Sequence, residues 1–141
     1  MLEAAATAKY IRTSAQKAGL VLDLIRGQQA AKALQVLRFT KKAVAKDVEK
    51  VLRSAIANAV HVADKNHKRR IDEDDLYVSA AFAGQGPSQK RVRPAPMGRA
   101  YRVIKRTTHL TVKVAESEAR RPAAKAEPAK KGGTRRARKT E

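Results

Sequence analysis

The sequence predicts an α+β fold, in which a small three-helix body packs on a short antiparallel sheet and a long β-hairpin protrudes from it. Three observations predict this arrangement. One stretch repeats apolar residues at steps of three and four, as an amphipathic helix does. Two later stretches alternate with a period of two, as strands do. The segment that joins them is basic and about twenty residues long, too long for an ordinary hairpin loop.

One strand and two short helices are expected in residues 4–37. Residues 4–12 alternate and are mildly β-prone near Tyr10. Ser14 is a potential N-cap for a helix that stops at Gly27, where glycine can adopt the left-handed conformation. The apolar side of that helix is expected to hold Leu20, Val21, Leu24 and Ile25. A second helix is expected over residues 28–37, with an inward face of Ala30, Ala33, Leu34 and Leu37.

The clearest element is a helix that begins after Thr40 and ends near Ala63. Charged residues such as Lys46 and Asp47 lie on its polar face. Residues 64–75 are charged and turn-like, and a strand is expected from Leu76. The apolar stripe of the helix consists of Val44, Val48, Val51, Leu52, Ala55, Ile56, Ala59 and Val60.

The two alternating stretches predict a pair of antiparallel strands. The first stretch places Leu76, Val78, Ala80 and Phe82 on one face of its strand. The second stretch places Ile104, Thr108, Leu110, Val112 and Val114 on one face of the other strand. Residues 84–106 are then the extended hairpin, and Gly84–Pro87 is interpreted as a turn. If its arms pair over about ten residues at ~3.3 Å each, its tip stands roughly 30 Å from the body.

The charge distribution points to a phosphate-rich partner. The formal net charge is +19, and residues 76–115 contain eight Lys or Arg but no Asp or Glu. Charge of one sign on an extended segment requires an anionic partner, of which a phosphate backbone is the commonest. Residues 1–115 are expected to form a single domain. Residues 116–141 lack apolar periodicity and are expected to be a disordered basic tail.

Several function classes are not expected. There is no cysteine and no apolar run of about 20 residues, so a soluble cytoplasmic protein is predicted. Asp72–Asp75 lacks the spacing of a calcium loop, and His61 and His67 have no third ligand, so neither a metal nor another cofactor is expected. With five aromatic residues in the chain, a large stacking platform for bases is not expected either.

Several strings, in this order, resemble the bacterial members of ribosomal protein family twenty-two of the large subunit. They are Thr13-Ser14-Ala15-Gln16-Lys17, Leu24-Ile25-Arg26-Gly27, Ser54-Ala55-Ile56-Ala57-Asn58-Ala59, Gly86-Pro87-Ser88, Lys90-Arg91, Gly98-Arg99-Ala100 and Lys105-Arg106-Thr107-Thr108-His109-Leu110-Thr111-Val112. The resemblance implies a body on the outside of the large subunit, a hairpin running into ribosomal RNA, and a role in assembly. It also implies that the hairpin tip lines the exit tunnel for nascent peptide, near where macrolides bind.

The resemblance, together with the charge pattern, assigns site residues. Contacts to ribosomal RNA are expected from Arg12, Lys17, Arg53, Lys90, Arg91, Arg93, Arg99, Arg102, Lys105, Arg106, Thr107 and His109. The tunnel tip is expected to include Ser88, Gln89, Lys90, Arg91, Arg93, Pro94, Ala95, Pro96 and Met97. The string Pro94-Ala95-Pro96-Met97 departs from the family pattern, which commonly has Arg before Ala and then a polar or basic residue.

The prediction is therefore a structural RNA-binding protein without enzymatic activity. It would be a monomer within the ribosome, contacting several RNA domains, neighbouring ribosomal proteins and the passing nascent peptide, with no membrane partner. Two alternatives stay open. A histone-like DNA-architectural protein would dimerise and bind duplex DNA as well as RNA. A cationic enzyme acting on nucleic acid would need a carboxylate cluster within the basic surface, and residues 76–115 supply none.

Overall fold

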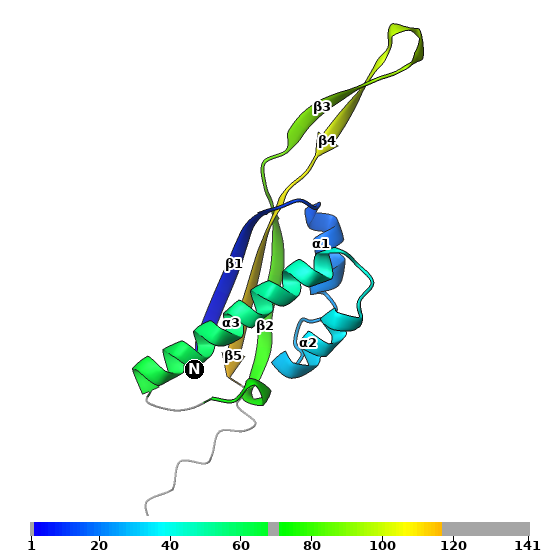
Figure 1. Ribbon diagram of the computed structural model, residues 1–141. Helices are drawn as coiled ribbons and strands as arrows, with labels where there is room; N and C mark the ends of the chain where they lie inside the picture. Colours follow the sequence, from blue (N-terminus) through cyan, green and yellow to red (C-terminus); the bar gives the residue numbers. More distant parts are fainter. Residues whose placement is uncertain (1, 68–70, 117–141) are drawn as a thin grey trace, which may run out of the picture.

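The computed structural model describes residues 2–67 and 71–116 (Figure 1), so the predicted tail from residue 117 onward lies outside the described residues. The α+β class is confirmed. In chain order the elements are β1 (Glu3–Ile11), α1 (Ala15–Leu22), α2 (Ala30–Phe39), α3 (Val44–His67), the 3-10 turn η1 (Glu73–Asp75), β2 (Leu76–Gln85), β3 (Gln89–Pro94), the 3-10 turn η2 (Pro96–Gly98), β4 (Ala100–Lys105) and β5 (Thr108–Glu116).

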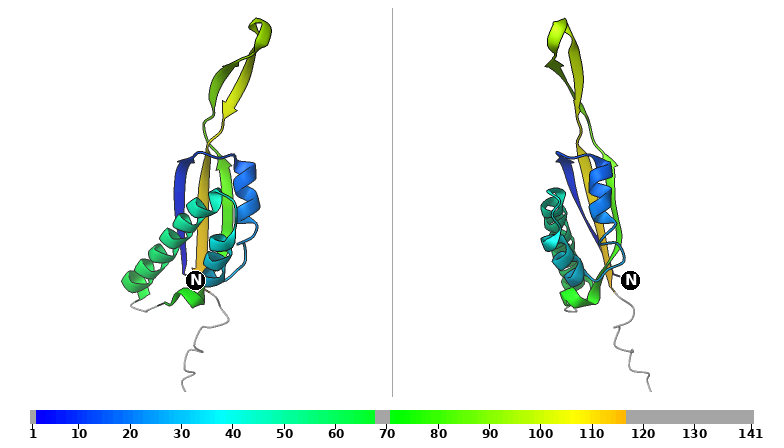
Figure 2. Two further views of the ribbon diagram at one scale, coloured as in Figure 1. Left: turned by 45° about the vertical axis from the view of Figure 1, so that its right-hand side comes forward. Right: turned by 90° about the vertical axis from the view of Figure 1, so that its right-hand side faces the viewer.

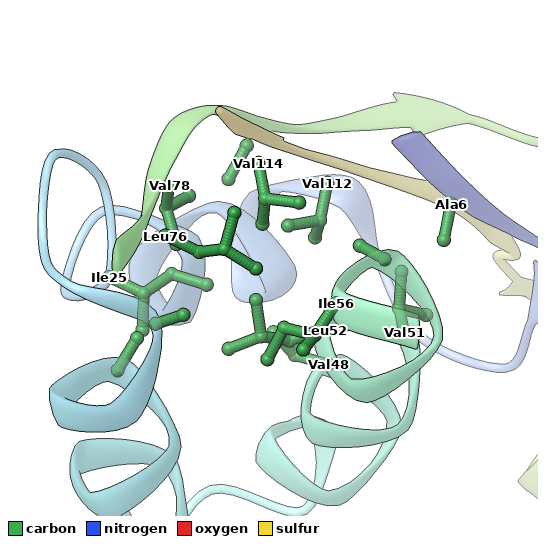
Figure 3. Packing of buried hydrophobic residues seen from close by; sticks show 14 of the residues in the cluster. Ala6, Ile25, Val48, Val51, Leu52, Ile56, Leu76, Val78, Val112 and Val114 are labelled. Carbon is green, nitrogen blue, oxygen red and sulfur yellow. The ribbon is translucent and has the colours of Figure 1, made fainter. Parts of the chain in front are cut away.

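The body is a two-layer structure of three antiparallel strands and three helices. The strand order is β1-β5-β2, so the last strand lies in the middle. The helices cover one face of this sheet, as the further views show (Figure 2). Alternate residues of the strands point to the helices, and the β5 residues Val112 and Val114 lie in the core (Figure 3). Leu110 of the same strand is also completely buried.

Helix α3 confirms the predicted apolar stripe except at Val60, which is half-buried and does not pack against the core. The α3 residues Val48, Leu52 and Ala55 are completely buried. Val48 and Leu52 face the strand residues Leu76 and Val78 in the core (Figure 3). The helix continues to His67, past the predicted end near Ala63. Among the helix residues whose side chains are described, Ala63 is the last one that is buried. Periodicity therefore marked the end of the buried face, while the charged residues that follow are still compatible with a helical backbone.

Helix α1 is shorter than predicted, and two of its four predicted core residues are wrong. It ends at Leu22, and the next residues form tight turns in which the Ile25 amide donates to the Leu22 carbonyl at 3.1 Å. These turns rotate Leu24 outward, whereas Ile25 remains buried. Leu20 is exposed as well. Gly27 has a φ of +71°, as expected of a glycine that ends a helix. Its amide donates to the Val78 carbonyl of β2.

The alternation predicted for β2 fails after Val78. A register shift between Val78 and Ala80 inserts one extra residue opposite β5. Such a bulge exchanges the two faces of a strand. In consequence Ala81 is buried and Phe82 is 48% exposed, the reverse of the predicted pattern. The antiparallel pairing of this strand with β5 is confirmed.

The hairpin is a separate two-stranded sheet that extends from one end of the body (Figure 1). Strands β3 and β4 pair over six residues, from Gln89 opposite Lys105 to Pro94 opposite Ala100. At ~3.3 Å per residue this paired part measures roughly 20 Å. It is shorter than the ten residues expected, because the ladder between β2 and β5 ends at Gln85 and Thr108 and a new ladder starts at Gln89.

The Thr108→Val variant tests how much the hydrogen bond from Thr108 to Gly84 stabilises the junction between sheet and hairpin. The Thr108 side chain is completely buried, and its hydroxyl donates to the Gly84 carbonyl at 2.7 Å. Replacing Thr108 with Val keeps the shape and removes the donor, so we expect a loss of about 1 kcal/mol in the free energy of unfolding by denaturant. The Thr111→Val variant is the control, because the Thr111 hydroxyl bonds to Thr7 on the exposed face. Equal stability of the two variants would contradict this role.

Candidate nucleic-acid interface

The hairpin is joined to the body by a short neck, which we define as residues 84–88 and 106–108. Besides the β2–β5 ladder, three hydrogen bonds cross it. The Gly86 amide donates to the Thr107 carbonyl at 2.9 Å, the Thr107 hydroxyl to the Pro87 carbonyl at 2.6 Å, and the Thr108 hydroxyl to the Gly84 carbonyl. The predicted turn at Gly84–Pro87 is wrong, since β2 stays extended to Gln85. Gly86 is required for a close approach to Thr107.

A cleft of about 760 Å³ lies where this neck meets the start of α1. Three segments far apart in the sequence form it. We call it the basic cleft, because five of its ten lining residues are cations and none is a carboxylate. Its walls are Arg12, Thr13, Ser14, Lys17, Gln89, Arg91, Ile104, Lys105, Arg106 and Thr107.

A smaller recess of about 330 Å³ continues past Arg106 to the first turn of α1. The Ser14 hydroxyl caps this helix by accepting from the Lys17 amide at 3.4 Å. The first turn contains no acidic residue, so the positive end of the helix dipole is not neutralised. Together with the cations of the cleft, this end of α1 favours an anion.

The cations of the cleft and hairpin differ from those of the body in their partners. On the body, Arg26 pairs with Asp23, Arg38 and Arg53 with Glu49, and Lys113 with Glu3. Within residues 2–67 and 71–116 no ion pair involves a cation of the basic cleft or the hairpin. These charges are therefore available to an external anion.

The hairpin presents cations on both faces, because directly opposite residues share a face. One face holds the pairs Gln89–Lys105, Arg91–Val103 and Arg93–Tyr101, and the other holds Lys90–Ile104, Val92–Arg102 and Pro94–Ala100. Each arm residue is exposed. Neither face can pack on an apolar protein surface without desolvating a charge.

Residues Pro94 to Met97 at the tip of the hairpin are uncharged, and Arg93 and Arg99 flank the turn. The Ala95 amide donates to the Arg99 carbonyl at 2.9 Å and closes a turn that contains Met97 and Gly98, both with positive φ. Met97 is 96% exposed. Of the predicted tip residues, only Pro94, Ala95, Pro96 and Met97 lie at this end. The others are near the neck or along β3, namely Ser88, Gln89, Lys90, Arg91 and Arg93.

The predicted RNA-contact residues fall into four places. Arg12, Lys17, Arg91, Lys105, Arg106 and Thr107 meet in the basic cleft, and Lys90, Arg93, Arg99 and Arg102 lie elsewhere on the hairpin. Arg53 lies apart on α3, with its guanidinium 2.7 Å from a Glu49 carboxylate oxygen. His109 lies beside the neck, where its Nδ1 accepts from the Tyr10 amide at 3.1 Å. That bond stabilises Tyr10, which has a φ of +62°.

Sequence reasoning missed Thr13, Ser14 and Ile104 as walls of the cleft. No local pattern could have identified them, because the cleft joins residues about ninety positions apart. No group of three or more His, Cys, Asp or Glu that could hold a metal occurs among the described residues. None of the helices in that part of the chain has the length and apolar content of a membrane span.

Comparison with known proteins places the chain among the ribosomal proteins. Residues 6–115 match the family described as ribosomal protein L22p/L17e, and the chain belongs to this family. It is 56% identical over 118 residues to the large ribosomal subunit protein uL22 of Solibacter usitatus (strain Ellin6076), which covers 84% of this chain and all of the relative. The resemblance seen in the sequence is confirmed, and with it a structural ribosomal role that is not enzymatic.

The hairpin cations should not contribute to the stability of the body. We expect the variant with Lys90, Arg91 and Arg93 all replaced by Ala to unfold within about 0.5 kcal/mol of the wild type, because all three side chains are exposed. Thermal unfolding followed by circular dichroism measures this. A large drop in the melting temperature would show instead that the hairpin is part of the core.

Proposed function

We propose that this protein is a constituent of the large ribosomal subunit that binds large-subunit ribosomal RNA through the basic cleft and the hairpin, and that it aids assembly of that RNA. The observation that carries the proposal is the acid-free cleft continuing into an acid-free hairpin. Crowded phosphates are the partner that such a surface fits. Because folded RNA is recognised largely through its shape and backbone, these contacts do not require recognition of a particular base sequence.

The two-stranded form of the hairpin supports this role. The paired backbone of β3 and β4 holds its cations in fixed positions, so less conformational entropy is lost when they meet phosphates. A narrow two-stranded arm can enter spaces between RNA helices that a helical body cannot. Binding several RNA domains at once would follow from cations on the cleft and on both hairpin faces.

The tip supports a second part of the proposal, that it lines the exit tunnel for nascent peptide. The residues at the end of the hairpin are Pro94, Ala95, Pro96 and Met97, and none is charged. The nearest cations, Arg93 and Arg99, lie on either side of this turn. An uncharged, exposed turn suits a wall past which peptides of any charge must move.

The proposal is tested by sedimentation of the endogenous protein. We expect it to remain with large subunits after a high-salt wash and to be absent from small subunits. Loss of the protein from large subunits in that wash would contradict the proposal. A binding comparison at matched salt tests the DNA-architectural alternative, which requires equal affinity for random duplex DNA and for large-subunit RNA.

A further inference from the structure

We propose that Tyr101 stacks on an unpaired base of the RNA strand held by the basic cleft, while Arg93 binds a phosphate of the same strand. The proposal rests on the proposed function of the cleft and adds a residue that reads a nucleotide base. Stacking on a base is a contact that the cations of the cleft, which bind phosphates, do not make.

The position of Tyr101 follows from the register of the hairpin. Tyr101 lies directly opposite Arg93, on the face that also carries Arg91 and Lys105. Arg91 and Lys105 are walls of the basic cleft, so this face continues the cleft toward the tip. Successive residues on one face of a strand are about 6.6 Å apart, which places the ring two steps beyond Lys105. An RNA strand leaving the cleft along this face would reach the ring.

The Tyr101 side chain has no role within the described part of the chain. It is 61% exposed, and neither its hydroxyl nor its ring has an interaction partner among residues 2–67 and 71–116. Tyr10 is a contrast, because it is equally exposed but its ring packs edge-on against His109 with the centroids 4.9 Å apart. Tyr101 is also the one aromatic residue between Ser88 and Arg106.

The neighbours of Tyr101 favour a nucleotide over an apolar protein partner. Arg93 lies opposite the ring, and Arg91 is the next cation along the same face of the hairpin. A partner that covered the ring with apolar side chains would desolvate these guanidinium groups without pairing them. A nucleotide satisfies both features, since its base stacks on the ring and its phosphate pairs with an arginine.

The test measures the affinity of the full chain for deproteinised large-subunit ribosomal RNA across a series of salt concentrations. Tyr101→Leu keeps apolar bulk but removes the ring, and we expect it to bind about tenfold more weakly, within the range for loss of one stacking ring. Its slope of log affinity against log salt should equal that of the wild type. Arg93→Ala should instead reduce the magnitude of this slope by roughly 0.7–0.9, as loss of one phosphate contact does.

Two further variants make the result specific. Tyr101→Phe should restore most of the affinity lost in Tyr101→Leu, because it keeps the ring. Val92→Ala, an exposed apolar residue on the opposite hairpin face, should bind as the wild type does. Ultraviolet crosslinking of the wild-type complex should attach a nucleotide to the tryptic peptide Ala100–Arg102.

Three outcomes would overturn the inference: wild-type affinity for Tyr101→Leu, a changed salt slope in that variant, or no crosslink at this peptide. Each leaves the proposed function intact if the wild-type protein still binds the RNA with a steep salt dependence. If the wild type shows no such binding, the proposed function fails first and this inference fails with it.

Discussion

We expect that replacing Arg12, Lys105 and Arg106 by Ala weakens binding to large-subunit ribosomal RNA by roughly 100-fold or more near physiological salt. These residues line the basic cleft and have no carboxylate partner among the described residues. A hydrogen bond to a charged group contributes about 1.5–3 kcal/mol, so loss of even part of three such contacts gives this effect. The magnitude of the salt slope should fall by about 2–3, since each phosphate contact contributes roughly 0.7–0.9. Filter binding across a salt series measures both quantities.

The matched control removes the same charge from another place. Lys41, Lys42 and Lys46 are exposed between α2 and the first turn of α3, and none lines the basic cleft. Their joint replacement by Ala also lowers the net charge by three, yet we expect only a few-fold loss of affinity. If both triple variants bind equally weakly, the interaction is diffuse attraction to a cationic protein, and the cleft has no special role.

The second large effect concerns Gly86 in the neck. A Cβ at this position would lie 2.5 Å from the Thr107 hydroxyl and 3.2 Å from the Thr107 carbonyl carbon. That hydroxyl is held by the Pro87 carbonyl, so Gly86→Ala must break this bond or shift the backbone. Overpacking of this kind costs about 1–3 kcal/mol. We expect the amide at position 86 to exchange its hydrogen about tenfold faster or more, and RNA affinity to fall because the hairpin direction is no longer fixed.

Gly84 provides the control for this prediction. It lies two residues earlier, and a Cβ there would meet nothing closer than the His109 carbonyl oxygen at 4.0 Å. Gly84→Ala should therefore keep both the exchange rate at position 86 and the RNA affinity. Equal effects of the two substitutions would mean that lost chain flexibility, and not the contact with Thr107, explains the result.

The sequence was sufficient for the class of fold and for its main elements. The stripe from Val48 to Ala59 predicts α3, and the parity of Thr108, Leu110, Val112 and Val114 predicts β5, because both patterns follow from one buried face. Local geometry was not predictable. The bulge after Val78 exchanges the faces of β2, and the tight turns after Leu22 turn Leu24 outward, although neither event leaves a mark in the apolar pattern.

The site was predicted in its chemistry but not in its shape. The acid-free run of Lys and Arg indicates an anionic partner, since charge is visible in sequence. The basic cleft is not visible, because it exists only where the segment 12–17 meets the neck across about ninety residues. The charged residues assigned to the tip illustrate the same limit, since register alone places Lys90 and Arg91 near the neck and Pro96 and Met97 at the end.

Whether the basic cleft binds ribosomal RNA can be seen in a density map of large subunits that contain this protein. We expect ribosomal RNA backbone within hydrogen-bonding distance of the Arg12, Arg91 and Lys105 side chains, with the hairpin surrounded by RNA. A basic cleft open to solvent or filled by another protein, or a hairpin folded back on its own helices, would show that the cleft does not bind RNA.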